Sequence, residues 1–267
     1  VQNGLCYDED NAFVRFYEQP EANAGNDQVL CNTFSFTLTA TPYEYCGEEG
    51  VNYWADRYWA LFGSPVDAEV TFYPDKYAST VYVTITSLDT CPFGTYTFQW
   101  AEINSKVEGE GCVDIDNVDI TIYESPEVDA GIDQFFCNTF EFTLDGTLDM
   151  PCNTAHMYSY SWELIDQPDQ CEVNIQPGGI DPLVIITDCS PCQYGKYVFR
   201  FTQQNGYYDD QQEWVMICED FDEVSVWIFE EPLNVDAGPD QNLCNEFDFT
   251  LTGSHDAFCG DAGVNNF

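Results

Sequence analysis

Cysteine is the residue type with the most chemical potential in this chain, which holds 13 cysteines among 267 residues. Cys189 and Cys192 form a C-x-x-C pair, the spacing of a redox-active dithiol, but no thioredoxin context accompanies it. Zinc would need a second such pair or added histidine ligands. The cysteines are therefore expected to form structural disulfides, which persist in an oxidising, extracellular compartment.

Other catalytic constellations are missing from the sequence. No G-x-S-x-G elbow, H-E-x-x-H pair or P-loop occurs. The two histidines, His156 and His255, stand at unmatched positions, which favours neither a Ser-His-Asp triad nor a zinc site. Carboxylate pairs are too numerous to single out a glycosidase site, and a small β-domain rarely offers the necessary cleft. The sequence predicts a protein that is not an enzyme and has no catalytic cofactor.

Acidic residues dominate the charge, since 48 Asp and Glu against 6 Lys and Arg give a net charge of −42. Such a chain is not expected to bind nucleic acid, because phosphate binding depends on Lys and Arg. Anionic membrane surfaces are disfavoured for the same reason. No run of 18 apolar residues occurs, so no membrane insertion of this segment is expected. With 44% hydrophobic residues, the chain can still build packed cores.

A sequence pattern recurs with a spacing of 106 residues from Cys31 to Cys137. Each copy reads Ala-Gly-x-Asp-Gln and then Cys-Asn-x-Phe-x-Phe-Thr-Leu. A second cysteine follows 15 positions after the first, and a cysteine with Asp at +2 and +4 and Pro at +14 precedes each copy. These landmarks predict the C-terminal hairpin of a preceding repeat at 1–20, whole repeats at 21–126 and 127–232, and the start of a further repeat at 233–267. We therefore expect a longer array.

The matched cysteines indicate a disulfide framework, although sequence alone does not fix its connectivity. In a β-sandwich the A–B and E–F loops lie at one pole and the B–C and F–G loops at the other, which favours bridges within a pole. Each bridge would stabilise its repeat by about 2–4 kcal/mol, mainly by restricting the unfolded chain. The favoured pairs are Cys31–Cys91, Cys46–Cys112, Cys137–Cys192, Cys152–Cys218 and Cys171–Cys189.

Acidic residues near the predicted repeat boundaries indicate a second use for the negative charge. Calcium takes six to eight oxygen ligands, and the Asp residues at +2 and +4 share one face of a strand. An ion at each boundary would offset repulsion and stiffen the junction, whereas solvation alone is the alternative use of these carboxylates. The candidate calcium ligands are Asp27, Asp114, Asp116, Glu124, Asp133, Asp220, Asp222, Glu230 and Asp240.

The elements that must position these residues are predicted to be strands. Apolar and polar residues alternate over 34–38, 79–85, 95–100 and 118–122, and again over 140–144, 183–187, 197–202 and 224–229. About seven short strands per repeat, with a Trp in a central strand (Trp59, Trp162), predict an all-β fold of tandem immunoglobulin-like sandwiches. An all-β barrel would give similar runs. Tyr96 and Tyr197, two residues after a Gly, are placed to form a tyrosine corner.

Together these motifs resemble the PKD-like and immunoglobulin-like repeats of Bacteroidota surface proteins. The resemblance rests on the Ala-Gly-x-Asp-Gln opening at Ala24, the Gly-x-Tyr-x-Phe strand at Gly94 and the hairpin Cys112. Such repeats occur in giant adhesins exported by the type IX system, including the gliding-motility adhesin filament. The Trp-Asp-Phe-Gly-Asp-Gly run typical of PKD domains is absent. The resemblance also implies another disulfide, because relatives with two cysteines keep the equivalents of Cys31 and Cys112.

The sequence and the resemblance predict a shaft segment of a long extracellular repeat adhesin or filament at the bacterial cell surface. It would extend a distal adhesive region and serve adhesion or gliding motility. Its expected partners are neighbouring repeats of the same chain, and surface polysaccharide or other shafts. The alternative is a glycan-binding module, because aromatic faces stack on sugars; core packing competes for the same residues. The aromatic cluster that prompts this alternative comprises Tyr43, Tyr45, Tyr53, Trp54 and Tyr58.

Overall fold

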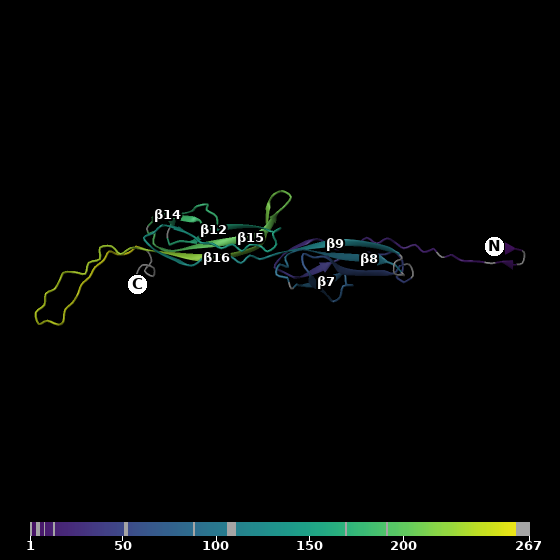
Figure 1. Ribbon diagram of the computed structural model, residues 1–267, viewed down its shortest axis with the longest axis horizontal. Helices are drawn as coiled ribbons and strands as arrows, with labels where there is room; N and C mark the ends of the chain where they lie inside the picture. Colours follow the sequence, from purple (N-terminus) through teal and green to yellow (C-terminus); the bar gives the residue numbers. More distant parts are fainter. Residues whose placement is uncertain are drawn as a thin grey trace. The chain divides into compact units, whose positions relative to one another are not determined.

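The computed structural model describes residues 2–3, 6–7, 9–12, 14–50, 53–87, 89–105, 111–168, 170–190 and 192–259. These residues form strands and contain no helix, so the described part of the chain has no helix that could cross a membrane. The chain divides into two compact units, Val1–Tyr123 (unit 1) and Glu124–Phe267 (unit 2) (Figure 1). The finer cuts after residues 20, 126 and 232 stay predictions.

Unit 1 is a sandwich of two sheets that enclose one apolar core. The four-stranded sheet has the order β3 (Gln28–Cys31), β9 (Cys112–Tyr123), β8 (Gly94–Asn104) and β5 (Ala55–Gly63). The three-stranded sheet has the order β4 (Ser35–Thr39), β7 (Thr80–Ser87) and β6 (Ala68–Tyr73). Neighbouring strands are antiparallel, except that β3 runs parallel to β9. A two-stranded hairpin of β1 (Gln2–Asn3) and β2 (Cys6–Tyr7) precedes them.

Unit 2 repeats this architecture strand for strand. Its four-stranded sheet has the order β10 (Gln134–Cys137), β16 (Trp214–Phe229), β15 (Gly195–Tyr208) and β12 (Met157–Asp166). Its three-stranded sheet has the order β11 (Glu141–Thr143), β14 (Leu183–Ser190) and β13 (Gln170–Ile175). Again the first strand, β10, runs parallel to the last, β16. The prediction of tandem immunoglobulin-like sandwiches with about seven strands each is confirmed in the described residues.

The core of unit 1 follows from the alternation along β8. Tyr96, Phe98 and Trp100 point to the same side and are fully buried, and burial of each aromatic side chain contributes about 2–3 kcal/mol. Trp59 packs on Trp100 with ring centroids 5.1 Å apart. However, Trp59 lies on β5 and Trp162 on β12, which are edge strands of their sheets. The prediction of a central Trp strand is therefore wrong, because each Trp is covered by the facing sheet rather than by two flanking strands.

The predicted tyrosine corner is present in both units. The Tyr96 hydroxyl donates a hydrogen bond to the Pro92 carbonyl oxygen at 2.7 Å, and the Tyr197 hydroxyl donates one to the Gln193 carbonyl oxygen at 2.8 Å. Both rings are fully buried, and burial raises the pKa of the Tyr96 hydroxyl. Each corner fixes the loop that enters the sixth strand of its unit, β8 or β15.

Candidate functional site

Near the start of each sandwich lies a segment that forms no strand of its own, residues 18–27 in unit 1 and 124–133 in unit 2 (the lead-in segments). In unit 1, the amide of Ala22 donates to Asp114 Oδ2 and the amide of Ala24 donates to Asp116 Oδ2, both at 2.8 Å. Both aspartates belong to β9. Their carboxylates therefore take the place of a strand ladder and hold the lead-in segment along the edge of β9.

Unit 2 has the same anchorage at the equivalent positions. The amide of Val128 donates to Asp220 Oδ2 at 3.5 Å, and the amide of Ala130 donates to Asp222 Oδ2 at 2.9 Å. One carboxylate of each lead-in segment makes the reverse contact and accepts a hydrogen bond from the backbone of the last strand. Asp27 Oδ1 accepts the Asp119 amide of β9 at 2.9 Å, and Asp133 Oδ1 accepts the Ser225 amide of β16 at 2.9 Å.

The glutamate two residues before the linker proline makes a further contact that occurs three times. Its Oε2 accepts a hydrogen bond from the amide of the second repeat cysteine, from Cys46 to Glu18 at 3.0 Å, from Cys152 to Glu124 at 2.6 Å and from Cys259 to Glu230 at 2.6 Å. In unit 1, the hydrogen bond from the Cys46 backbone lowers the pKa of Glu18. The carboxylate therefore stays ionised and holds the loop after the second strand to the lead-in segment.

These contacts give the predicted calcium ligands another role. Within the described part of the chain, eight of the nine named carboxylates accept a backbone hydrogen bond, and Asp240 is exposed. No group of three or more His, Cys, Asp or Glu with metal-site geometry occurs among the described residues. The calcium site stays a prediction, and an ion there would have to compete with N–H groups for the same oxygens.

The repeated Ala-Gly-x-Asp-Gln motif is explained by the same anchorage. Ala24 is buried, and Gly25 has a φ of +87°, where its absent Cβ would lie 2.6 Å from the Thr39 carbonyl oxygen. Only glycine accepts this close approach without strain. The side-chain amide of Gln28 donates to the Thr37 carbonyl oxygen at 3.0 Å, and those of Gln134 and Gln241 make the same bond. The motif is a structural device that docks the lead-in segment onto the second strand.

Buried polar residues on the sixth strand complete the site and are not among the sequence-predicted residues. Asn104 donates from Nδ2 to the Glu18 carbonyl oxygen at 3.0 Å, and Asn205 does the same to Glu124 at 2.9 Å. Glu102 accepts from the Trp100 indole at 3.0 Å, whereas the equivalent Gln203 binds the backbone of Asp149. All four polar side chains are at most 1% exposed. The signal in the sequence is a Glu/Gln-x-Asn pattern on the otherwise apolar face of this strand.

The cysteines depart from the favoured framework at several positions. Cys171 and Cys189 are bonded as predicted. Cys31, Cys91, Cys152 and Cys218 are also in disulfides, and the pairs Cys31–Cys91 and Cys152–Cys218 stay predictions. The favoured Cys137–Cys192 pair is not formed in this structure, because Cys192 is bonded to Cys259, whose amide Glu230 holds nearby.

Free thiols correct two further expectations. Among the described cysteines, Cys46, Cys112, Cys137 and Cys244 are free, so the Cys46–Cys112 pair and the family-implied Cys31–Cys112 pair are both wrong. The Cys112 thiol instead donates to the Tyr17 carbonyl oxygen at 3.5 Å. Cys46 lies against Glu18, which raises the pKa of its thiol. Cys189 and Cys192 bond different partners and therefore do not form a C-x-x-C disulfide, which agrees with the expectation of structural disulfides.

The aromatic cluster predicted as a sugar platform is largely packed against itself. The Tyr45 ring lies 4.9 Å from that of Tyr43 and stacks on Tyr53 at 4.8 Å. The Tyr43 hydroxyl donates to Glu18 Oε1 at 3.2 Å, which makes this ring part of the anchorage. Trp54 lies under the Arg15 guanidinium, 5.3 Å from the ring centroid.

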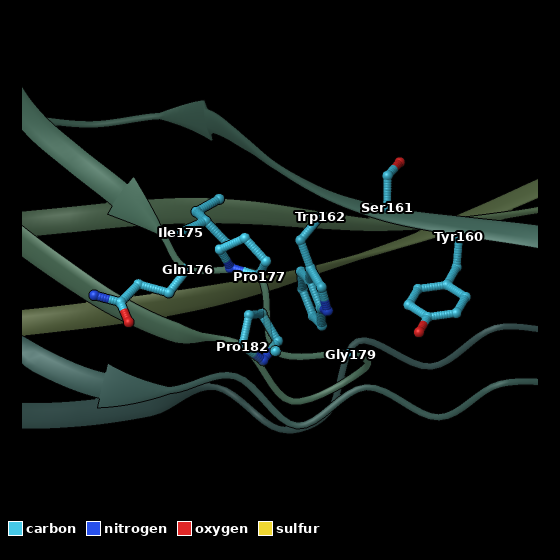
Figure 2. Close-up of a pocket in the computed structure, with 9 residues that line it drawn as sticks. Tyr160, Ser161, Trp162, Ile175, Gln176, Pro177, Gly179 and Pro182 are labelled. Carbon is cyan, nitrogen blue, oxygen red and sulfur yellow. The ribbon is translucent and has the colours of Figure 1, made fainter.

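A more open aromatic groove lies in unit 2. It has a volume of about 610 Å³ and runs between β12 and the turn of residues 176–182. Figure 2 shows the rings of Tyr160 and Trp162 on the side of β12 that faces Gly179 and Pro182. The Trp162 indole donates to the Ile180 carbonyl oxygen at 2.8 Å, which fixes the ring, and Tyr160 is 40% exposed.

Comparison with known proteins finds similarity in fold. No protein-family model and no curated protein matches the chain. The titin I-band fragment I67–I69 matches with 12% identity and a TM-score of 0.40, over 81% of this chain and 68% of that one. Sidekick-1 immunoglobulin domains 1–5 match with 11% identity and a TM-score of 0.41, over 81% and 40%. The PKD domain of human KIAA0319 matches with 15% identity and a TM-score of 0.27, over 44% and 93%.

Proposed function

We propose that this chain is a stretch of the structural shaft of a long, secreted repeat protein at a bacterial cell surface, of the type IX-exported adhesin kind and serving adhesion or gliding. The observation that carries the proposal is the carboxylate anchorage, which ties each lead-in segment to its own sandwich by the same bonds in both units. A segment that only linked two binding domains would not need such anchorage. The disulfides support an oxidising, extracellular compartment.

The strand directions support a role under tension. β3 and β9 are parallel neighbours, as are β10 and β16. Tension applied at the start of the first strand and the end of the last pulls the two strands along their length in opposite directions. All hydrogen bonds between them then resist together, rather than breaking one at a time. The carboxylate bonds of the lead-in segment add to this resistance.

Single-molecule force spectroscopy on the 267-residue chain tests this role. We expect Asp222→Ala to lower the unfolding force of unit 2 and leave that of unit 1 unchanged, while the exposed Glu141→Ala leaves both unchanged. The Cys171–Cys189 bond encloses a sequence separation of 18 residues. At about 3.3–3.6 Å per extended residue, this loop alone holds back about 60 Å. Full reduction also opens the Cys192–Cys259 bond, with a separation of 67 residues, and should lengthen the extension of unit 2 by more than that. Equal unfolding forces in Asp222→Ala and Glu141→Ala would contradict a tension-bearing lead-in segment.

Location at the cell surface has a separate test. Antibodies raised against the chain should label intact cells of the source organism without permeabilisation. Labelling that appears only after the cells are opened would contradict the surface location.

The groove beside Tyr160 and Trp162 favours glycan binding as a second candidate function. Aromatic faces and a polar peptide turn are the usual lining of a site that holds a sugar ring. Pull-down on insoluble polysaccharides should then show saturable binding that Tyr160→Ala abolishes and Tyr77→Ala preserves. Tyr77 is a suitable control because it is an exposed tyrosine of unit 1. Equal retention of both variants, or no saturable binding of the unmodified chain, would leave the shaft as the sole candidate.

A further inference from the structure

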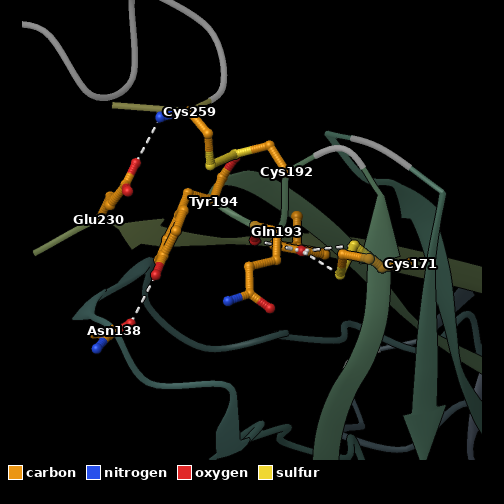
Figure 3. The surroundings of a disulfide bond; sticks show 9 residues. Asn138, Cys171, Cys192, Gln193, Tyr194, Glu230 and Cys259 are labelled. Carbon is orange, nitrogen blue, oxygen red and sulfur yellow. Dashed lines mark hydrogen bonds between the residues drawn. A yellow bond between two sulfur atoms is a disulfide. The ribbon is translucent and has the colours of Figure 1, made fainter. Parts of the chain in front are cut away.

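A disulfide in unit 2 joins two segments that the sequence assigns to different repeats. Cys192 precedes β15 and is bonded to Cys259. Figure 3 shows this bond beside Glu230, which accepts the hydrogen bond from the Cys259 amide. With the predicted boundary after residue 232, Cys192 belongs to one repeat and Cys259 to the next. The bond is therefore a covalent tie between consecutive repeats.

A free thiol, Cys137, lies close to this tie. Cys137 is exposed and ends β10, where its partner in the parallel ladder is Phe229. Gly195, three residues after Cys192, pairs with Ile228, the chain neighbour of Phe229. Neighbouring strands lie about 4.8 Å apart, and β10 and β15 flank β16. The segments that carry Cys137 and Cys192 are therefore about two strand spacings apart, and the loop that carries Cys192 must move toward Cys137 before the two sulfurs can bond.

Side chains bridge the remaining gap. The Tyr194 hydroxyl donates to Asn138 Oδ1 at 2.8 Å, a contact that Figure 3 shows. The Tyr194 ring lies 5.4 Å from that of Phe140. Tyr194 is two residues from Cys192, and Asn138 is the residue after Cys137. The loop that carries the bonded cysteine is thereby held over the strand that carries the free one.

Unit 1 has the same strand pairing around the two equivalent cysteines, but there both cysteines are oxidised. Cys31 pairs with Tyr123 and Gly94 with Ile122, as Cys137 and Gly195 do in unit 2. Cys31 and Cys91, the counterparts of Cys137 and Cys192, are both in disulfides. This strand pairing is therefore compatible with a disulfide-bonded cysteine at the position where unit 2 has a free thiol.

We propose that Cys192 is a two-way disulfide site, bonded either to Cys259 of the following repeat or to Cys137 of its own. The Cys137 thiolate attacks Cys192 Sγ, so that the Cys137–Cys192 bond forms while the Cys192–Cys259 bond breaks. The proton lost from Cys137 is regained by the departing Cys259 thiolate. One thiol and one disulfide are present before and after, so no oxidant or reductant is consumed.

The exchange replaces a disulfide between two repeats, Cys192–Cys259, by a disulfide within one repeat, Cys137–Cys192. In the first state the segment ending at Cys259 is covalently fixed to unit 2. In the second it is held there by the hydrogen bond to Glu230, which does not depend on sulfur. A tensioned junction could thus lengthen without a change in redox conditions. The sulfur chemistry can be tested on the chain alone, independently of the shaft function.

Thiol mapping of the intact chain tests the proposal. Free thiols are trapped with a maleimide at pH 6, or after hours at pH 8.5, and located by mass spectrometry of non-reduced peptides. We expect labelling of Cys137 to fall and labelling of Cys259 to rise by equal amounts at pH 8.5, as a Cys137–Cys192 peptide appears. Because the thiolate is the attacking species, the exchange should quicken about tenfold per pH unit below the thiol pKa.

Two variants make the outcome decisive. Cys137→Ser should keep Cys259 unlabelled at both pH values. Cys244→Ser removes another exposed free thiol and should behave as the unmodified chain. The proposal is overturned if Cys137 stays fully labelled after incubation at pH 8.5. It is equally overturned if Cys259 is released as fast in Cys137→Ser as in the unmodified chain.

Discussion

Replacement of Asp116 by alanine tests the anchorage of the lead-in segment most directly. Asp116 is half-buried, and its Oδ2 accepts the amide proton of Ala24 at 2.8 Å. Ala24 is only 2% exposed, so water cannot freely replace the lost acceptor. A buried donor that loses its partner costs about 1–3 kcal/mol. For a loss of about 2 kcal/mol, the Ala24 amide should exchange with solvent deuterium about 30-fold faster.

The charge of the chain requires a matched control in this experiment. At a net charge of −42, removal of any carboxylate relieves some repulsion, which acts against the expected loss. Glu69→Ala removes an exposed carboxylate of β6 in the same unit and measures this relief. Asp116→Asn keeps an oxygen acceptor without the charge and should give an effect between the two.

Hydrogen exchange followed by mass spectrometry on peptides covering residues 18–27 provides the assay. Faster exchange in Asp116→Ala confined to this segment is the expected result. If the segment exchanges no faster in Asp116→Ala than in Glu69→Ala, the carboxylate does not hold the lead-in segment, and the role we assign to the four equivalent aspartates is refuted.

Three further predictions concern pH, packing and metal. The hydrogen bond from the Cys46 amide lowers the pKa of Glu18 below its ordinary 4.5. The contribution of this bond to the free energy of unfolding is therefore complete above pH 4.5 and is lost as the pH falls through the lowered pKa. The Cys46 amide resonance should titrate in the unmodified protein and not in Glu18→Gln. Tyr96→Phe should lower the free energy of unfolding by about 1–2 kcal/mol in urea, whereas Tyr82→Phe, at a 49% exposed position, should change it little. If the carboxylates bind calcium, chelation should lower the thermal midpoint and added calcium should restore it; an unchanged midpoint would contradict the predicted calcium site.

The sequence alone was sufficient for the features that depend on local pattern. Alternation over 95–100 specified which side chains of β8 enter the core, because successive strand residues point to opposite faces. The Gly-x-Tyr spacing specified the tyrosine corner, whose hydrogen bond spans only four residues. The repeat itself predicted that two units would share one fold, and the acidic landmarks marked where their lead-in segments are held.

Tertiary structure decided the features that depend on which distant residues become neighbours. Asp114 and Ala22 are 92 residues apart in the chain, and they meet because β9 lies beside the path of the lead-in segment. Sequence showed that the aspartates share a face, yet calcium and a backbone amide are equally compatible with that face. The cysteines show the same limit. Pole assignment placed Cys192 within reach of Cys137, but the position of the chain after residue 232 determined that Cys259 was the sulfur it bonded.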